Sequence, residues 1–189
     1  MEIKYISDGA MTEKQQKDVD IINDTCLGGD SEGTEENFDI NTYGYSAPED
    51  GMFLLFDGER AVGRAAVHKT PTEYNGQEYY LGGFGGLAVL PEYQGKGYAR
   101  KLAEAALEKA YEIGVDVACM EVDTKSGIAG FYKKLGFAFL NRPAYFINHG
   151  NNEAADDNVM IRGLCNEKLS DKVLATNYKF HYGKSKGHW

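Results

Sequence analysis

A glycine-bearing loop between an apolar run and an amphipathic stretch constrains this chain more than any other feature. The run Leu87-Ala88-Val89-Leu90 ends at Pro91, and the loop Gln94-Gly95-Lys96-Gly97-Tyr98-Ala99 follows. From the loop to Ile113, apolar residues recur at three- and four-residue spacing, which predicts a helix with one apolar face. Gly114 then stands where a helix C-cap is expected. The pattern predicts a strand that leads through a glycine loop into a helix.

This order of elements is suited to binding phosphate. The first amides of a helix have no intrahelical acceptor, and the helix dipole adds positive potential at the same end. Glycines allow an anion to approach the backbone closely. The spacing excludes a Walker loop, because no Ser or Thr follows Lys96. It also excludes a three-glycine dinucleotide fingerprint, because Tyr98-Ala99-Arg100 follows Gly97.

The chain before this loop predicts a strand, a helix and a β-meander. Residues 1–7 alternate in polarity, and Thr12 followed by Gln15 has capping-box spacing that begins a helix. Three strands are expected next, at Met52–Phe56, at Ala61–His68 and from Tyr79 onward, and the segment Lys69–Gln77 holds the polar turn Tyr74-Asn75-Gly76. The glycine doublets Gly82-Gly83 and Gly85-Gly86 predict a bulge or a close ligand approach in the third strand.

The chain after the predicted helix alternates between strands and one short helix. Val115–Val122 is expected to lie parallel to the glycine-ended strand, because strand–helix–strand crossovers are right-handed. Thr124–Gly136 predicts a short helix with Ile128 on its apolar face. Phe137–Phe146 and Asn158–Leu164 predict a closing hairpin.

Charge and cysteine content exclude several classes of partner. The formal net charge of −9 argues against nucleic acid or an anionic membrane and suits a cationic small molecule. Cys26, Cys119 and Cys165 lack metal-type or CxxC spacing, so neither a disulfide framework nor a metal site is expected. The sequence shows no membrane-length apolar span and no signal-type start. We expect one cytoplasmic domain over residues 1–189.

Two motifs give the chain a family resemblance. The stretch Gln94–Ala99 reads Q-x-x-G-x-A after "LAVLPEY", and Phe131–Phe137 reads "FYKKLGF". Both resemble signatures of the GCN5-related N-acetyltransferase (GNAT) superfamily. The resemblance implies an α+β fold with a mixed, mostly antiparallel central sheet flanked by helices. It also implies a V-shaped splay between two parallel central strands. In this superfamily the loop holds the pyrophosphate of acetyl-CoA, whose acetyl group passes directly to an amine.

A narrower likeness is to the aminoglycoside 2′-N-acetyltransferases. It rests on the spacing from "GMFLLFDGERAVGRAAV" through "YNGQEYYLGGFGGLAV" and on Asp156-Asp157 before a strand. The chain departs from that subfamily at Gly85 and Gly187, where the subfamily has a glutamate and an aspartate. These departures leave both the usual base and the aminoglycoside acceptor open.

The superfamily's chemistry assigns roles to particular residues. Gln94, Gly95, Lys96, Gly97, Tyr98 and Ala99 would bind the coenzyme together with Leu87, Ala88 and Val89. The amides of Leu87 and Val89 would stabilise the oxyanion of the thioester carbonyl. Tyr132 would protonate the departing thiolate as general acid. No carboxylate lies in Leu81–Leu90, so the base is open between the Trp189 carboxylate, Asp123 and His188.

The acceptor is the least constrained part of the prediction. The acidic candidates for amine contacts are Asp30, Glu35, Glu36, Asp123, Asp156 and Asp157. An aminoglycoside-like compound is the leading candidate, and a polyamine, an amino acid or a protein N-terminus stay open. The alternative from another class is a non-catalytic acyl-CoA-binding module that kept the loop and lost its base. A homodimer is also left open.

Overall fold

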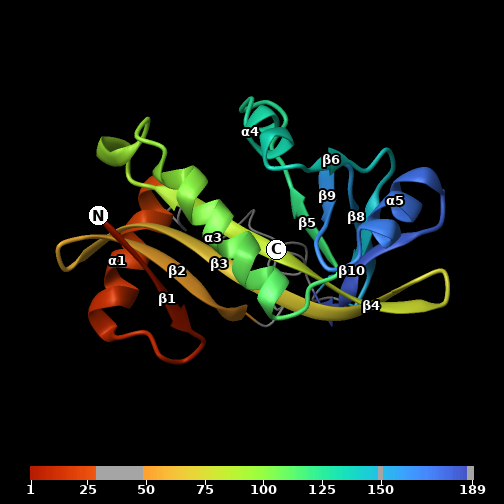
Figure 1. The fold of residues 1–189 in the computed structure, drawn as a ribbon, viewed down its shortest axis with the longest axis horizontal. Helices are drawn as coiled ribbons and strands as arrows, with labels where there is room; N and C mark the ends of the chain where they lie inside the picture. Colours follow the sequence, from red (N-terminus) through yellow and green to blue (C-terminus); the bar gives the residue numbers. More distant parts are fainter. Residues whose placement is uncertain (29–48, 149–150, 187–189) are drawn as a thin grey trace. The chain divides into compact units, whose positions relative to one another are not determined.

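Two long strands, β3 (Arg60–Tyr74) and β4 (Gln77–Val89), contribute residues to both units into which the chain divides (Figure 1). The structure is a computed structural model that describes residues 1–28, 49–148 and 151–186. Of these, the first unit holds 1–28, 49–68 and 84–109. The second unit holds 69–83, 110–148 and 151–186.

The remaining elements follow the chain in order. Those that begin in the first unit are β1 (Glu2–Ser7), α1 (Glu13–Asn23), the π-helical turn η1 (Asp24–Gly28), β2 (Glu49–Asp57), the 3₁₀ turn η2 (Pro91–Tyr93) and α3 (Tyr98–Glu112). Those of the second unit are β5 (Val117–Glu121), α4 (Ala129–Lys134), β6 (Ala138–Phe139), β7 (Ala144–Ile147), β8 (Glu153–Asp156), β9 (Val159–Gly163), α5 (Glu167–Ala175) and β10 (Phe180–Lys186).

The strands form a mixed sheet and a smaller second sheet. The hydrogen-bonded order is β1-β2-β3-β4-β5-β9-β6 in the first and β10-β7-β8 in the second. β1 and β3 both pair antiparallel with β2. β5 pairs parallel with β4, with Leu81 opposite Val117 and Gly82 opposite Ala118. The predicted α+β fold and the predicted parallel pair are confirmed. The splay beyond Gly83 involves residues of both units and stays a prediction.

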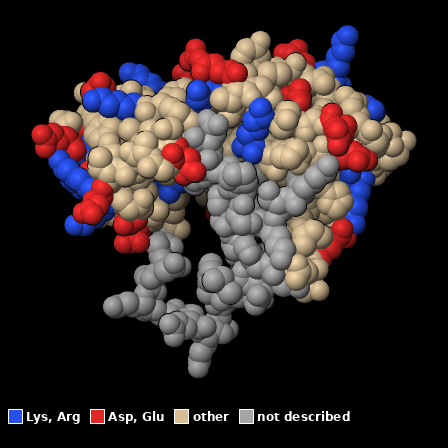
Figure 2. All heavy atoms as spheres, turned by 90° about the horizontal axis from the view of Figure 1, so that it is seen from below, with Lys and Arg blue, Asp and Glu red and all other residues tan. Residues whose placement is uncertain are grey.

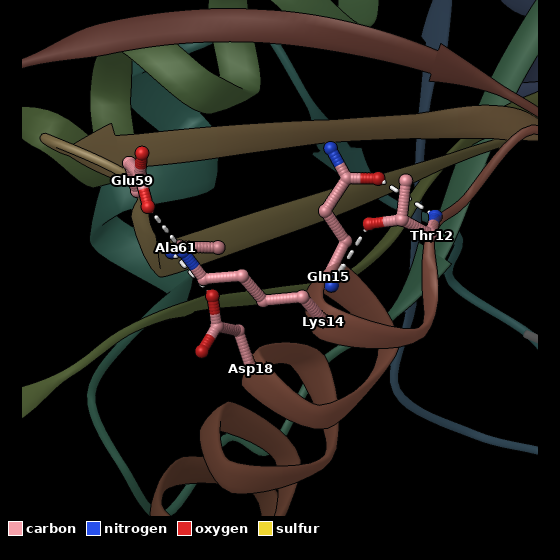
Figure 3. Close-up of polar contacts among 6 residues, drawn as sticks. All are labelled: Thr12, Lys14, Gln15, Asp18, Glu59 and Ala61. Carbon is pink, nitrogen blue, oxygen red and sulfur yellow. Dashed lines mark hydrogen bonds and ion pairs between the residues drawn. The ribbon is translucent and has the colours of Figure 1, made fainter.

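Polar contacts at the first turns of helix α1 hold this helix against the β2–β3 hairpin (Figure 3). The backbone amide of Gln15 donates to Thr12 Oγ1 at 3.3 Å, and the backbone amide of Thr12 donates to Gln15 Oε1 at 2.8 Å. The predicted capping box is therefore present. Asp18 Oδ2 accepts from the amide of Ala61 at 2.8 Å, at the start of β3. α1 is therefore held both by its own cap and by a side-chain bond to the sheet.

Thr12→Ala is expected to lower the free energy of unfolding by about 1 kcal/mol, because it removes the acceptor for the Gln15 amide. Urea unfolding monitored by circular dichroism would measure the change. The matched control is Thr25→Ala, at an exposed threonine in η1, which should stay within about 0.5 kcal/mol of the wild type. Equal effects of the two substitutions would contradict a stabilising role for the cap.

Helices α1 and α3 lie on opposite faces of β3. A Cβ at Gly63 would stand 3.2 Å from Leu102 Cδ1, so α3 covers the face to which Gly63 belongs. Arg64 donates from Nη1 to Asn23 Oδ1 of α1 at 2.7 Å. Because successive residues of a strand face opposite sides of a sheet, α1 covers the other face. Val19 and Ile22 of α1 are both buried.

The second unit has its own apolar core, which Arg142 helps to close. The core includes Tyr74 and Leu81 from β3 and β4, Val117 and Cys119 from β5, and residues of β7, β9, α5 and β10. The guanidinium of Arg142 donates to Tyr74 Oη at 2.8 Å and to the carbonyls of Val173 at 2.8 Å and Tyr178 at 3.0 Å. One side chain thereby ties β3 to α5 and to the segment that precedes β10.

The predicted closing hairpin is confirmed only in the antiparallel pairing of β6 with β9, because β7 and β8 lie between these two strands in the chain. Residues 137–146 break into β6, which pairs with β9 in the large sheet, and β7, which pairs with β8 and β10 in the small one. The break includes Arg142, whose side chain bonds within the core as described above, and Pro143, which has no amide to donate to a sheet. β8 and α5 were not anticipated.

Two predicted boundaries are also corrected. Strand β3 continues to Tyr74 rather than ending at His68, with Thr70, Thr72 and Tyr74 alternating as buried residues. The turn predicted at Tyr74-Asn75-Gly76 is confirmed, because Asn75 and Gly76 both have positive φ. The short helix begins at Ala129 rather than Thr124, and Ile128 is exposed instead of inward.

Protonation of buried His68 is expected to destabilise the protein in mild acid. The side chain is 1% exposed, and burial lowers its pKa from 6.5 to about 3. The folded state therefore takes up its proton at lower pH than the unfolded state. The contribution of neutral His68 to the free energy of unfolding is fully present above pH 6.5 and is lost as the pH falls toward about 3. The loss is at most about 1.4 kcal/mol per pH unit.

Chemical unfolding at pH 7 and pH 5 would measure this loss. The difference should shrink in His68→Asn and persist in His181→Asn, since the His181 ring is much less buried than that of His68. If His68→Asn keeps the full acid sensitivity of the wild type, another group is responsible.

Candidate active site

The loop Gln94–Ala99 and the first turn of α3 form an open cradle of backbone amides. Gly95 and Gly97 have φ of +72° and +80°, in the left-handed region that favours glycine. A Cβ at either position would meet no atom within 4 Å. Among the described residues, no backbone carbonyl accepts a hydrogen bond from the amides of Gly95, Lys96 or Gly97. The first α3 bond of the ladder runs from Lys101 to the carbonyl of Gly97 at 3.2 Å, so the preceding amides also point out of the helix.

Side chains of the loop hold its shape and leave the amides open. Gln94 Nε2 donates to the carbonyl of Val89 at 2.8 Å, which ties the loop back to the end of β4. Lys96 Nζ donates to the carbonyl of Glu92 at 2.9 Å and lies 5.4 Å from the centre of the Tyr93 ring. The predicted coenzyme contacts of these residues are therefore backbone contacts, with the Lys96 charge close by. The cradle fits a diphosphate.

The last residues of β4 turn alternate amides away from β3. Leu90 donates its amide to the carbonyl of Val62 at 2.9 Å, so its polar groups face β3. Successive residues of a strand direct their polar groups to opposite edges, so Ala88 also faces β3 while Leu87 and Val89 face the other edge. The Val89 carbonyl accepts from Gln94 and, at 3.5 Å, from Cys26 Sγ of η1. By this alternation the amides of Leu87 and Val89 are directed away from β3, and their oxyanion role stays a prediction.

The glycines of β4 allow close contacts with protein groups, and the predicted close approach of a ligand stays a prediction. Gly83 and Gly86 have φ of +127° and +57°. A Cβ at Gly83 would stand 3.2 Å from the Cys119 carbonyl oxygen, and one at Gly86 would stand 2.6 Å from Arg64 Nη2. The sequence interpretation missed Arg64, although a single charge within the otherwise apolar "AVGRAAV" was a signal for it.

Tyr132 lies in α4 of the second unit. The side chain is half-buried, with its ring centroid 5.2 Å from that of Phe131 and 6.3 Å from that of Phe137. Burial raises the pKa of its hydroxyl above the usual value of 10.0. The phenol therefore stays protonated at neutral pH, as a proton donor must. Its approach to the coenzyme sulfur stays a prediction, since the cradle belongs to the first unit.

Asp123 is engaged in a turn of its own. Its Oδ1 accepts from the amide of Lys125 at 2.8 Å, and its carbonyl accepts from Ser126 Oγ at 2.8 Å. This turn occupies the start of the region predicted as helix and explains why α4 begins late. The Asp123 side chain is exposed, and through these bonds it stabilises the turn. Its proposed roles as base and as substrate contact stay predictions.

Asp156 and Asp157 differ in surroundings. Asp156 is half-buried at the end of β8, and Asp157 is exposed. Burial first, then nearby charges including the carboxylate of Asp156, raises the pKa of the Tyr182 hydroxyl well above its usual value. Asp156 thus belongs to the packing of the small sheet, and substrate contacts of both aspartates stay predictions.

Several predicted site residues lie outside the described residues. These are Asp30, Glu35, Glu36, His188 and Trp189. Within residues 1–28, 49–148 and 151–186, no group of three or more His, Cys, Asp or Glu side chains is arranged to hold a metal ion. Over the same residues, no helix has the length and apolarity needed to cross a membrane. On the face in Figure 2, acidic and basic side chains are interspersed.

Comparison with known proteins gives one family and many similar folds. The profile described as "Acetyltransferase (GNAT) family" matches residues 19–137. The GNAT family N-acetyltransferase YhbS from Escherichia coli, solved in complex with CoA, is 16% identical with a TM-score of 0.59, covering 95% of this chain and 87% of that chain. The ribosomal-protein-S18-alanine N-acetyltransferase from Escherichia coli is 19% identical with a TM-score of 0.53, covering 86% and 94%.

A third structure shows how far these likenesses extend. The GCN5-related N-acetyltransferase from Kribbella flavida is 20% identical with a TM-score of 0.55, and the match covers 74% of this chain. This chain spans only 33% of the length of that protein. At these identities the structural likeness shows the fold alone. A comparison with curated protein sequences gave no match.

Proposed function

The chain belongs to the GNAT acetyltransferase family, and we propose that it moves the acetyl group of acetyl-CoA directly onto a primary amine of a cationic small molecule. The observation that carries this proposal is the open cradle at Gly95–Gly97, where left-handed glycines stand before the N-terminus of α3 and their amides find no acceptor in the described part of the chain. Such an arrangement binds a diphosphate without any basic side chain being required.

The residues of the chain divide the work of acyl transfer. Bound acetyl-CoA supplies an activated acyl group as a thioester. The amides of Leu87 and Val89 hold the carbonyl oxygen as negative charge grows on it, and one such donor contributes roughly 3 kcal/mol in a preorganised site. Tyr132 donates its hydroxyl proton toward the coenzyme sulfur. The amine must be neutral to attack, and its proton leaves through water or through the Trp189 carboxylate, Asp123 or His188.

The acceptor class rests on sequence patterns and charge. The aminoglycoside-like acceptor is suggested by the similarity in motif spacing to the aminoglycoside 2′-N-acetyltransferases. Gly85 argues against this acceptor, because that subfamily has a glutamate at the corresponding position. A polyamine, an amino acid and a protein N-terminus are the other amines within the proposal. The cytoplasm is the proposed location, in keeping with three free cysteines in a chain that needs no disulfide.

One observation favours a second function, an acyl-CoA-binding module without catalysis. Residues 81–90 of β4 and its end contain no carboxylate that could act as a base. A thiol-release assay with acetyl-CoA and a panel of amines, followed by mass spectrometry of the amines, separates the two functions. Free thiol with a 42-dalton gain on one amine, roughly the mass of an added acetyl group less the hydrogen it replaces, supports transfer. Coenzyme binding without release for every amine supports the module.

A further inference from the structure

A cavity in the first unit lies on the α1 face of the sheet. Its volume is about 420 Å³, and the end of β1, the β1–α1 connection, α1, β2 and β3 all contribute to its lining. Every lining residue belongs to the first unit. The size falls within the range of about 300–1,000 Å³ that small-molecule sites commonly have. Since α3 covers the opposite face of β3, the cavity is separate from the face on which α3 packs.

Arg64 brings a positive charge into this cavity from the otherwise apolar stretch 61–67 of β3. Its neighbours Gly63 and Ala65 on β3 are buried, while Arg64 is half-buried and lines the cavity. Asn23 Oδ1, 2.7 Å from Nη1, fixes the direction of the guanidinium. A guanidinium is a planar fork of N–H donors that matches the two oxygens of a carboxylate.

The place of this guanidinium connects the cavity to the acyl-transfer position. Arg64 Nη2 lies 2.6 Å from the position that a Cβ of Gly86 would occupy. The Arg64 side chain therefore packs directly against β4, and it leaves no room for a side chain at position 86. Gly86 immediately precedes Leu87, whose amide is proposed to hold the thioester carbonyl. An anion bound by Arg64 would therefore be anchored one residue away from the reacting carbonyl.

The cavity carries both signs of charge. Asp8, in the β1–α1 connection, lines the same cavity as Arg64 and is exposed. A ligand with one amine and one carboxylate has a counter-charge for each of its groups, whereas a polycation without an anionic group leaves Arg64 facing like charge. Like charges brought together in a partly buried site disfavour binding.

From these observations we infer that the cavity is the acceptor subsite and that Arg64 recognises a carboxylate on the acceptor. The acceptor is then an amine of amino-acid type, which carries a carboxylate in addition to the acetylated amine. This inference rests on the proposed function and narrows it, since a basic amino acid remains a cationic small molecule. Arg64 acts as a specificity-determining residue, and aminoglycosides without a carboxylate are expected to be poorer acceptors.

The test uses matched pairs of acceptors that differ only in charge. Basic and neutral amino acids are compared with their carboxamides, and one aminoglycoside is included. The wild-type protein should acetylate the carboxylate form roughly 10- to 100-fold more efficiently by kcat/KM than the carboxamide. Arg64→Gln should remove that preference, and Arg64→Lys, which keeps the charge without the fork, should keep part of it.

The matched control is Arg60→Gln, at an exposed arginine on the same strand whose guanidinium is 3.9 Å from Glu92 Oε1. Arg60→Gln should leave the preference intact. Affinity for acetyl-CoA, measured by calorimetry, should be unchanged in all three variants, which shows that they fold. A purely structural Arg64 would alter stability in the glutamine and lysine variants without changing the ratio between paired acceptors.

The outcomes separate this inference from the proposed function. Turnover of amines with no preference for the carboxylate form overturns the carboxylate subsite and leaves the acetyltransferase proposal standing. If no amine is acetylated, the proposed function fails, and calorimetry of amino acids against CoA-loaded protein decides the inference. Binding that is lost in Arg64→Gln and kept in Arg60→Gln supports it, and absence of binding overturns it.

Discussion

Gly97→Glu is expected to abolish binding of acetyl-CoA, raising the dissociation constant by at least about 100-fold. Gly97 has φ of +80° in the loop before α3, and the space beside its Cα is open. A glutamate there would place bulk and negative charge where the diphosphate should lie. Two like charges about 4 Å apart repel by about 4 kcal/mol at an effective dielectric constant of 20. Calorimetric titration with CoA and with acetyl-CoA would measure the loss.

The control for this substitution is Gly76→Glu. Gly76 also has a positive φ, +76°, with open space beside it, and it lies in the β3–β4 turn of the second unit. Both substitutions impose a backbone strain of roughly 1–2 kcal/mol and the same charge change. Gly76→Glu should lower thermal stability while keeping coenzyme affinity. Unchanged affinity in Gly97→Glu would show that the loop is not the phosphate site, and the transferase proposal would lose its main support.

Local patterns in the sequence predicted those elements whose signals lie within a few residues. The capping box at Thr12 and Gln15 depends on two side chains three residues apart, and the structure confirms it. The α3 helix from Tyr98 to Glu112 follows from apolar spacing, and Gly114 has the positive φ that its C-cap position requires. The parallel pairing of β5 with β4 followed from chain handedness alone.

Long-range contacts decided the elements that the sequence did not predict. Residues 137–146 look like one strand, yet Arg142 leaves the strand because its bonding partners, Tyr74 and Val173, come from distant parts of the chain. Such bonds cannot be read from local periodicity, because the alternatives are similar in local free energy and tertiary packing selects among them.

The same distinction between local patterns and long-range contacts applies to the candidate site. The cradle at Gly95–Gly97 could be predicted, since glycine spacing before a helix encodes it locally. The cavity with Arg64 could not be predicted, because its lining comes from four separate segments of the chain. The base candidates Trp189 and His188 lie outside the described residues.

Tyr132→Phe is expected to lower kcat by roughly 100-fold or more, because it removes the general acid that protonates the departing thiolate. Phenylalanine keeps the ring and its packing beside Phe131 and Phe137, so affinity for acetyl-CoA and thermal stability should change little. Burial raises the pKa of the Tyr132 hydroxyl above 10.0. The wild-type kcat should therefore keep more than half of the contribution of this group up to pH 10.0. Steady-state kinetics over the pH range would measure both effects.

The choice of leaving group separates proton donation from a positioning role for Tyr132. An acetyl thioester of a more acidic thiol needs less protonation as it departs, so it should recover much of the lost rate in Tyr132→Phe. A hydroxyl that only orients the coenzyme would give the same deficit with every thiol. Tyr111→Phe, at a tyrosine that is 60% exposed, serves as the control and should match the wild type with each donor. A normal kcat in Tyr132→Phe would assign the proton to water and remove Tyr132 from the chemistry, while leaving the cradle and its coenzyme in place.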